Sequence, residues 1–223
     1  MITMPLLFRE GHVYLETGRE LWLFDTGSPA SFGASGTITL ANETFRVGSS
    51  YLGLTAATLS GFVGVDCIGL LGADVLGQFD FILDVPNGKV VISTSDLEHN
   101  GTTISLGAFM GIPIVTGQIR GRDCRMFFDT GASISYIQND EMRTSFPASG
   151  RVSDFYPGFG QFETDTHSVD IILGTLELTL RCGELPGVLG EVLAMADTEG
   201  ILGNQILSGQ AAGYFPRRRL LVL

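Results

Sequence analysis

The tripeptide Asp-Thr-Gly occurs twice in this chain, beginning at Asp25 and again at Asp129. The two aspartates are 129 − 25 = 104 residues apart, close to half of the 223-residue chain. A chain made of two similar halves can bring one carboxylate from each half to a common centre. Two carboxylates in contact cannot both ionise cheaply, so such a pair retains one proton over a broad pH range. The spacing therefore predicts acid–base chemistry by Asp25 and Asp129.

A shared proton determines what such a pair can do. The ionised carboxylate accepts a proton from a bound water molecule, while the protonated one polarises a carbonyl group. The expected reaction is hydrolysis of an amide without a covalent intermediate. For one Asp-Thr-Gly alone, a turn is the favoured interpretation, because Asp and Gly are common turn residues. Two copies, each placed after an apolar strand, favour catalysis.

The residues that follow each aspartate suit a catalytic loop. Gly27 and Gly131 let the backbone turn tightly and leave amide groups free to bind a carboxylate. Thr26 and Thr130 can each tie one loop to the other through a hydroxyl group. These four residues are therefore expected to support the two aspartates.

The residue after each glycine differs between the loops. Ser28 is expected to donate a hydroxyl hydrogen bond to Asp25, whereas Ala132 offers Asp129 nothing equivalent. A carboxylate with an additional donor ionises more readily. The difference predicts that Asp25 is the ionised partner and Asp129 the protonated one.

Both loops require similar elements to position them. Two strands with a turn are expected before each loop, and the chain after each loop is again similar in the two halves. Gly69–Leu76 matches Gly200–Leu207, each indicating a strand that ends at a glycine and enters a short helix. A closing hairpin follows at 79–93 and at 213–223. Thirty glycines beside apolar runs favour many short strands, and hence an all-β fold.

These motifs resemble those of the pepsin-like and retropepsin-like aspartic proteases. The likeness rests on Phe-Asp-Thr-Gly-Ser at 24–28, Phe-Asp-Thr-Gly-Ala-Ser at 128–133, and the apolar-apolar-Gly motifs at 70–72 and 201–203. It implies two similar β-barrel-like lobes related by a pseudo-twofold axis, as in a retropepsin dimer joined into one chain. Proton sharing between the two carboxyl groups is an established property of that family, so the resemblance implies it for this chain as well.

A polar stretch from Ser93 to Gly101 is the natural linker between the halves. The predicted lobes are 1–97, which holds the first Asp-Thr-Gly, and 98–223, which holds the second. We expect neither lobe to complete a site by itself.

The second half carries additional residues between its two motifs. Asp25 and Gly72 are 47 residues apart, whereas Asp129 and Gly203 are 74 apart, and most of the difference of 27 lies within 139–169. An aromatic, Gly-rich segment there, 155–162, could form a mobile hairpin over a substrate cleft.

Tyr156 or Phe159 would form the aromatic tip of such a flap and contact substrate. An ordinary surface hairpin remains an equal alternative at this point. The first half is too short for a flap, since about eight residues separate Ser28 from the strand-like stretch Thr37–Leu40. The flap would therefore lie in the opposite half from that of pepsin-like enzymes.

Charge and hydropathy exclude several classes of partner. The formal net charge is −11, with a single lysine, Lys89, so a nucleic-acid partner is not expected. The triplet Arg217–Arg219 favours a solvated turn over a binding patch. No apolar run reaches the 18 residues of a membrane span, and 1–16 lacks the pattern of a signal peptide. These patterns predict neither a membrane partner nor export, and favour the cytoplasm.

Metal and disulfide chemistry are also not expected. The cysteines and histidines are Cys67, Cys124, Cys182, His12, His99 and His167. Their spacing matches no zinc site, so no metal and no cofactor are predicted. Cys124 and Cys182 could pair if the protein were exported, but buried free thiols are the favoured interpretation.

The sequence thus predicts an aspartic endopeptidase with an acidic pH optimum that is active as a monomer on peptide or protein substrates. The main alternative is a catalytically silent, protease-like protein that binds peptides, although such proteins usually lose one carboxylate. A β-barrel carrier would leave the duplicated loops unexplained. A phosphoaspartyl enzyme would need a phosphate loop or a metal-binding acidic motif, and neither is present in the sequence.

Overall fold

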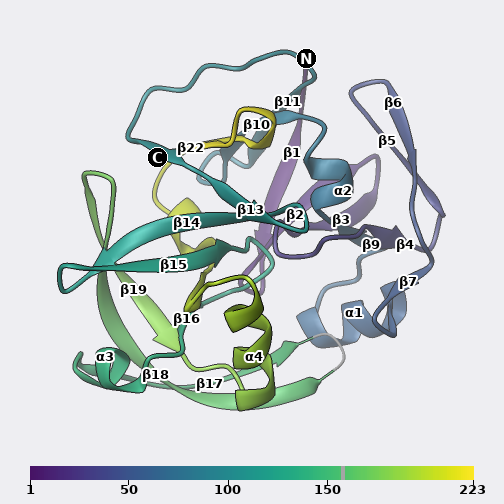
Figure 1. Ribbon diagram of the computed structural model, residues 1–223. Helices are drawn as coiled ribbons and strands as arrows, with labels where there is room; N and C mark the ends of the chain where they lie inside the picture. The colour runs from purple at the N-terminus through teal and green to yellow at the C-terminus, as the bar shows by residue number, and fades with distance from the viewer. Residues whose placement is uncertain (157–158) are drawn as a thin grey trace.

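The structure is a computed structural model that describes residues 1–156 and 159–223. It is mostly β, as predicted, and the two halves follow each other through the elements labelled in Figure 1. The elements of the first half are β1 (Ile2–Arg9), β2 (His12–Thr17), β3 (Glu20–Phe24), β4 (Phe32–Gly33), β5 (Thr37–Leu40), β6 (Glu43–Arg46), β7 (Ser50–Tyr51), β8 (Leu54–Thr55), α1 (Ala56–Val63), β9 (Gly69–Leu71), α2 (Ala73–Leu76), β10 (Asp80–Asp84) and β11 (Lys89–Ser93).

The second half repeats this order with a longer insertion. Its elements are β12 (Thr103–Ser105), β13 (Gly107–Phe109), β14 (Ile112–Ile119), β15 (Arg122–Phe128), β16 (Ser135–Ile137), α3 (Asp140–Thr144), β17 (Ala148–Tyr156), β18 (Gly160–Leu173), β19 (Leu176–Gly183), α4 (Gly187–Met195), β20 (Gly200–Leu202), the 3₁₀ helix η1 (Asn204–Leu207), β21 (Ala212–Phe215), the 3₁₀ helix η2 (Pro216–Arg218) and β22 (Leu220–Val222). The paired strands before each loop, the strand–glycine–helix motifs and the closing hairpins all lie where the sequence predicts them.

One sheet joins the two halves. Its ten strands run β12-β22-β21-β10-β11-β1-β2-β3-β9-β4, so strands of the second half add directly to strands of the first. The join is the antiparallel pair β10–β21, in which Phe81 lies opposite Tyr214. β11 ends at Ser93 and β12 begins at Thr103, which leaves the predicted linker outside the strands. The lobe boundary at 97/98 stays a prediction.

Each Asp loop is held by the same three-strand arrangement. β9 lies between β3, to which it is parallel, and β4, to which it is antiparallel. In the second half β20 lies in the same way between β15 and β16. The loop that joins the outer strands must therefore pass over the end of the inserted strand, which fixes its position.

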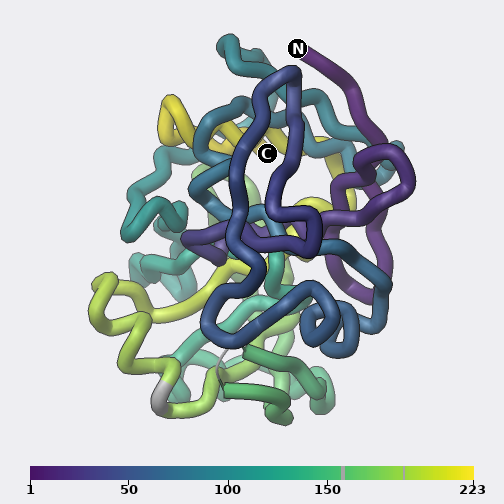
Figure 2. Tube along the Cα trace, turned by 90° about the vertical axis from the view of Figure 1, so that its right-hand side faces the viewer, coloured from purple at the N-terminus to yellow at the C-terminus, as the bar shows by residue number. Residues whose placement is uncertain are grey.

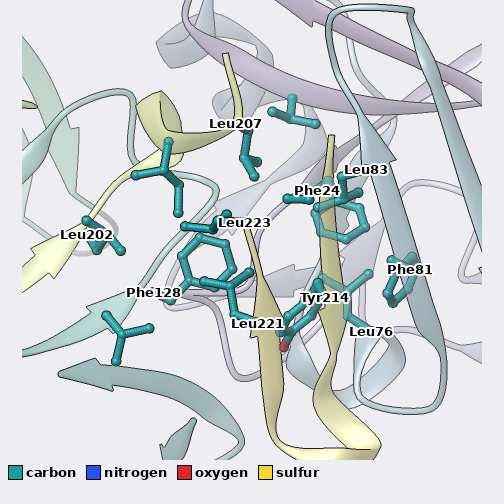
Figure 3. Packing of buried hydrophobic residues seen from close by; sticks show 14 of the residues in the cluster. Phe24, Leu76, Phe81, Leu83, Phe128, Leu202, Leu207, Tyr214, Leu221 and Leu223 are labelled. Atoms are coloured by element: carbon teal, nitrogen blue, oxygen red, sulfur yellow. The ribbon is translucent and has the colours of Figure 1, made fainter. Parts of the chain in front are cut away.

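Aromatic side chains from both halves pack together behind the loops (Figure 3). Phe24 meets Phe81 edge-on at 5.1 Å, and Phe128 meets Tyr214 edge-on at 5.9 Å. All four side chains are essentially inaccessible to solvent. Because Phe24 and Phe128 directly precede Asp25 and Asp129, burial worth about 1.5–3 kcal/mol per side chain also anchors the loops.

The two hairpins that follow the Asp loops have different places. β5–β6 packs its Phe45 edge-on against Phe79 of the core at 5.6 Å, and in Figure 2 it runs up the face turned toward the viewer. In Figure 1 the longer β17–β18 hairpin runs along the bottom of the molecule, and its end lies below α1. The additional residues of the second half thus form a hairpin, as predicted; residues 157 and 158 of its expected tip lie outside the described residues.

The arginine triplet forms a turn at the surface, as the sequence favours, but two of its side chains also form ion pairs. Arg218 forms an ion pair with the fully buried Asp80 of β10 at 2.7 Å, and Arg217 pairs with Asp96 at 2.8 Å. These contacts attach the C-terminal hairpin to the first half and to the linker. The pairing has a physical reason, because Asp80 without a partner would be a costly buried charge.

Cys67, Cys124 and Cys182 are free and buried, in agreement with the favoured interpretation. Burial raises the pKa of the Cys124 and Cys182 thiols to about 12, which makes both unreactive at neutral pH. A helix long and apolar enough to span a membrane is not found in the described part of the chain.

Candidate active site

The backbone places the two aspartates symmetrically. The Asp25 amide donates a hydrogen bond to the carbonyl of Leu71 at 3.0 Å, and the Asp129 amide donates to that of Leu202 at 2.9 Å. Leu71 and Leu202 are the last residues of β9 and β20, the inserted strands. Each aspartate is therefore fixed by the apolar-apolar-Gly motif of its own half.

Thr26 and Thr130 join the two loops to each other. The Thr26 hydroxyl donates to the Phe128 carbonyl at 2.6 Å, and the Thr130 hydroxyl donates to the Phe24 carbonyl at 2.7 Å. Each hydroxyl also accepts the backbone N–H of the other threonine at 3.0 Å. The predicted role of both threonines is thus confirmed by reciprocal hydrogen bonds.

Backbone amides hold one oxygen of each carboxylate. Asp25 Oδ1 accepts from Gly27 N at 2.8 Å and from Ser28 N at 3.0 Å. Asp129 Oδ1 accepts from Gly131 N at 2.8 Å and from Ala132 N at 3.2 Å. The second oxygen of each carboxylate stays available for chemistry.

The two glycines allow the carboxyl groups to approach each other. A Cβ atom at Gly27 would lie 2.1 Å from Cγ of Asp129, and one at Gly131 would lie 2.5 Å from Cγ of Asp25. Any larger residue would occupy the place of the opposite carboxyl group. The loops therefore lie against each other and bring Asp25 and Asp129 together at the base of a cleft.

The two carboxyl groups lie close together, and the pKa of each is raised. Burial, followed by the charge of Asp129, raises the pKa of Asp25 well above its usual value. The pKa of Asp129 is also raised, chiefly by burial, but the hydrogen bond from Asp25 counteracts this effect. The pair therefore retains a proton more tightly than two separate aspartates would, and in the reaction proposed below Asp25 is taken as the protonated partner.

The opposite assignment made from the sequence relied on the Ser28 hydroxyl, and the structure removes that basis. The Ser28 hydroxyl donates to the carbonyl of Ala30 at 2.9 Å, so its single proton is not directed at Asp25. Only the Ser28 backbone amide supports Asp25, just as Ala132 supports Asp129. The difference in side chain between these two positions therefore does not distinguish the carboxylates.

His12, in the first half, contacts the Asp129 loop of the second half and so makes the surroundings of the two Asp loops differ. Its Nδ1 lies 2.9 Å from the carbonyl oxygen of Gly131, so this nitrogen carries the proton and donates it. Asn204 Nδ2 donates to the carbonyls of Gly11 and Thr130 at 2.8 and 3.1 Å. The β1–β2 turn of the first half thus supports the Asp129 loop. Burial lowers the pKa of His12, which keeps the ring neutral.

A cleft of about 570 Å³ opens above the dyad, and its walls are mostly apolar. Both halves contribute to it. The described residues that line it include Leu23, Phe32, Tyr51, Leu52, Leu54, Leu59 and Leu70 from the first half, and Phe109, Met110, Ile112, Phe127, Tyr136, Asp154, Phe155, Tyr156, Phe159, Phe162, Leu185, Leu189, Val192, Leu193 and Ile201 from the second. Such walls suit the apolar side chains of an extended peptide.

The β17–β18 hairpin extends over this cleft. Phe155 stacks on Phe62 of α1 with ring centres 4.9 Å apart, so the hairpin of the second half contacts the first half. Tyr156 and Phe159, the predicted flap residues, both line the cleft. Burial, followed by the charges of Asp129 and Asp25, raises the pKa of Tyr156. The location of the hairpin matches a flap, and its mobility stays a prediction.

Sequence reasoning did not identify Tyr136 and Asp154. The buried Tyr136 hydroxyl donates to a carboxylate oxygen of Asp154, which links the hairpin to the strand that follows the Asp129 loop. One signal was present: Asp154 is two residues from Tyr156, so both lie on the same face of a strand.

In each half, an inserted strand (β9 or β20) lies between the strands that flank an Asp-Thr-Gly loop. This arrangement and the pairing of the two loops define a bilobal acid-protease fold. Among solved structures, the aspartic proteinase from Irpex lacteus is similar, with a TM-score of 0.56 and 13% sequence identity over 99% of this chain and 96% of that one. No protein-family model matches the sequence, and no curated protein matches it significantly. The likeness is therefore one of fold.

Proposed function

We propose that this chain is an aspartic endopeptidase that hydrolyses peptide bonds with an acidic pH optimum. The observation that supports this most strongly is the pair of carboxyl groups, Asp25 and Asp129, which the two loops bring together in the lining of one cleft. Both come from one chain, so the enzyme is active as a monomer. No cofactor takes part in the proposed reaction.

In the proposed reaction, Asp129 removes a proton from a water molecule as the water oxygen attacks the peptide carbonyl carbon. Asp25 donates its proton to the carbonyl oxygen, and a tetrahedral diol forms. In the second step the C–N bond breaks as Asp129 gives its proton to the leaving nitrogen. Asp25 recovers a proton from one diol hydroxyl as the new carboxylic acid forms, so the dyad returns to its starting state.

The cleft supports an extended peptide as the substrate. Its walls come from both halves, and the edge of the β17–β18 hairpin can pair with the substrate backbone as a strand does. Substrate side chains would lie in the apolar walls on either side of the dyad. An acidic optimum follows from the need to keep Asp25 protonated.

The test is cleavage of an unfolded protein substrate between pH 3 and pH 7. Wild type is compared with Asp25→Asn and Asp129→Asn, each with and without pepstatin, and Asp123→Asn serves as a control for loss of an exposed carboxylate. We expect cleavage by wild type and the control only, with inhibition by pepstatin. Cleavage that persists in either dyad variant would contradict the mechanism.

A folded wild type that cleaves nothing at any pH would favour the silent peptide-binding protein. In that case, a labelled extended peptide should still bind the folded chain. Fluorescence anisotropy of such a peptide distinguishes this outcome from a protein with no peptide site.

A further inference from the structure

The cleft contains one charge that the proposed mechanism does not use. Among the described residues that line it, Asp154 is the only charged side chain besides the dyad. It lies on β17, two residues before Tyr156 and within the hairpin that extends over the cleft. Asp154 is half-buried, and a carboxylate partly withdrawn from water in a mostly apolar wall gains from a charged partner.

The contacts of Asp154 hold its carboxylate in place but do not neutralise it. Oδ1 accepts from the Phe155 amide at 2.7 Å, and Oδ2 accepts from the Tyr136 hydroxyl. Both donors are uncharged, and a carboxylate has about four acceptor positions, so about two remain. None of the ion pairs among the described residues involves Asp154.

Asp154 is joined to the Asp129 side of the cleft by Tyr136, which donates to it and lies on β16, the strand after the Asp129 loop. Its charge acts on both Asp129 and His12, and His12 contacts the Asp129 loop directly. The Nδ1 proton of His12 is directed at the Gly131 carbonyl, and burial lowers the pKa of its ring. A substrate residue next to the cut bond, on the side of Asp129, would therefore lie near an uncompensated carboxylate.

We infer that Asp154 is a specificity-determining residue that accepts the cationic side chain of a lysine or arginine in the substrate, beside the cut bond on the Asp129 side. This inference rests on the proposed endopeptidase function. The aliphatic stem of the lysine packs on the apolar wall, and its ammonium group reaches the free acceptor positions of Asp154. The low dielectric of the wall strengthens that pair relative to one in water.

The competing role for Asp154 is purely structural: it would only hold the hairpin in place through Tyr136. The two roles differ in their effect on substrates. Loss of a structural contact lowers cleavage of all peptides by a similar factor, whereas loss of a specificity contact lowers cleavage of basic peptides selectively.

The test uses matched apolar peptides that carry either lysine or norleucine at each position flanking the cut bond. Norleucine has a side chain of similar shape to lysine without the ammonium group. We expect wild type to favour lysine at one position by at least about tenfold in kcat/KM, as for a site that bonds a polar group. Asp154→Asn should bring the lysine-to-norleucine ratio close to one. Asp154→Lys should reverse the preference toward a glutamate peptide.

Two control variants separate charge from structure. Asp123→Asn removes an exposed carboxylate outside the cleft, and Tyr136→Phe removes the hydroxyl while leaving the Asp154 charge. Both should retain the lysine preference. A preference lost equally in Tyr136→Phe, or rates lowered equally for both peptides in Asp154→Asn, would overturn the inference in favour of the structural role.

Failure of the inference can be distinguished from failure of the proposed function. Cleavage that depends on Asp25 but shows no basic preference at any position overturns the inference alone. If no cleavage depends on Asp25, the inference about Asp154 is tested by binding instead. Calorimetry then compares the affinity of Asp25→Asn for the lysine peptide with its affinity for the norleucine peptide. Tighter binding of the lysine peptide, lost in Asp25→Asn/Asp154→Asn, supports the inference, and equal binding overturns it.

Discussion

Thr26 and Thr130 hydrogen-bond to each other twice, each backbone N–H donating to the other hydroxyl at 3.0 Å. Both side chains are fully buried, and each hydroxyl donates a hydrogen bond to a backbone carbonyl of the opposite half. Water cannot replace these partners at a buried site. The relative position of the two Asp loops, and hence of the dyad, therefore depends on both hydroxyl groups.

Thr26→Val should cost both stability and activity. It leaves the Thr130 N–H and the Phe128 carbonyl without their hydroxyl partner, at about 1–3 kcal/mol for each buried group. Thr26→Ser keeps the hydroxyl and should lose much less. Urea denaturation and kcat of both variants provide the comparison, and equal losses in the two would show that methyl packing, not the hydroxyl, is what matters.

Removing either carboxyl group of the dyad should stabilise the protein at neutral pH. A carboxyl group whose folded-state pKa is raised favours folding below its unfolded pKa, and this contribution is lost as pH rises through the folded pKa. Asp25→Asn and Asp129→Asn each lack one of these carboxyl groups, so they avoid its loss of folding stability as pH rises. We expect the melting temperature at pH 7 to rise by a few degrees, since about 1 kcal/mol corresponds to roughly 2–4 °C in a chain of this size.

The advantage of these two variants should shrink as pH falls toward 3.8, the usual pKa of the group, where the wild-type carboxyl groups are also protonated. Calorimetry from pH 7 to pH 4 measures the trend. A variant less stable than wild type at pH 7 would contradict the raised pKa values.

His12 should have the opposite effect on stability. Its pKa is lowered by burial, so the unfolded chain binds a proton more readily than the folded one, and stability falls as pH drops through 6.5, its usual value. In His12→Gln this particular loss is absent. The difference in unfolding free energy between His12→Gln and wild type should therefore shift in favour of the variant between pH 7.5 and pH 5.

Urea titrations at several pH values measure this difference. His12→Ile, which copies Ile112 of the other half, should show the same pH trend from a lower starting stability, because it also removes the donor to Gly131. A pH-independent difference for both variants would mean that the folded-state pKa of His12 is not lowered.

Phe62→Ala should loosen the hairpin over the cleft. It removes the ring that stacks on Phe155, a contact worth about 0.5–1.5 kcal/mol beyond simple burial. In the proposed enzyme we expect KM to rise roughly 2- to 10-fold, with a smaller change in kcat. Phe8→Ala, another exposed phenylalanine, serves as the matched control. Equal KM and kcat values for the two variants would contradict a role of the hairpin in substrate binding.

The sequence was sufficient for the features that are local and occur twice. Each Asp loop, its preceding strands and its apolar-apolar-Gly motif could be predicted because strand periodicity and glycine positions lie within short segments. The reciprocal threonine bonds followed from the symmetry of the two motifs. The position of the β17–β18 hairpin followed from comparing lengths, since the 27 additional residues had to lie outside the shared framework.

The features that escaped prediction depend on contacts between distant residues. His12 meets Gly131 across 119 positions of the sequence, and no local pattern indicates that contact. Ser28 was misjudged for the reverse reason: a carbonyl two residues away, that of Ala30, accepts its hydroxyl proton. Asp154 and Tyr136 are 18 residues apart, and the turn, helix and strand between them hid their proximity.

The sheet that joins the two halves determines how a substrate can enter. Because β10 and β21 are adjacent hydrogen-bonded strands, a hinge opening of one half against the other would have to unzip backbone pairs beside Phe81 and Tyr214. That makes the body of the molecule a rigid frame. In the proposed enzyme, we therefore expect a substrate to enter and leave by movement of the β17–β18 hairpin, which contacts the first half through the Phe62–Phe155 stack.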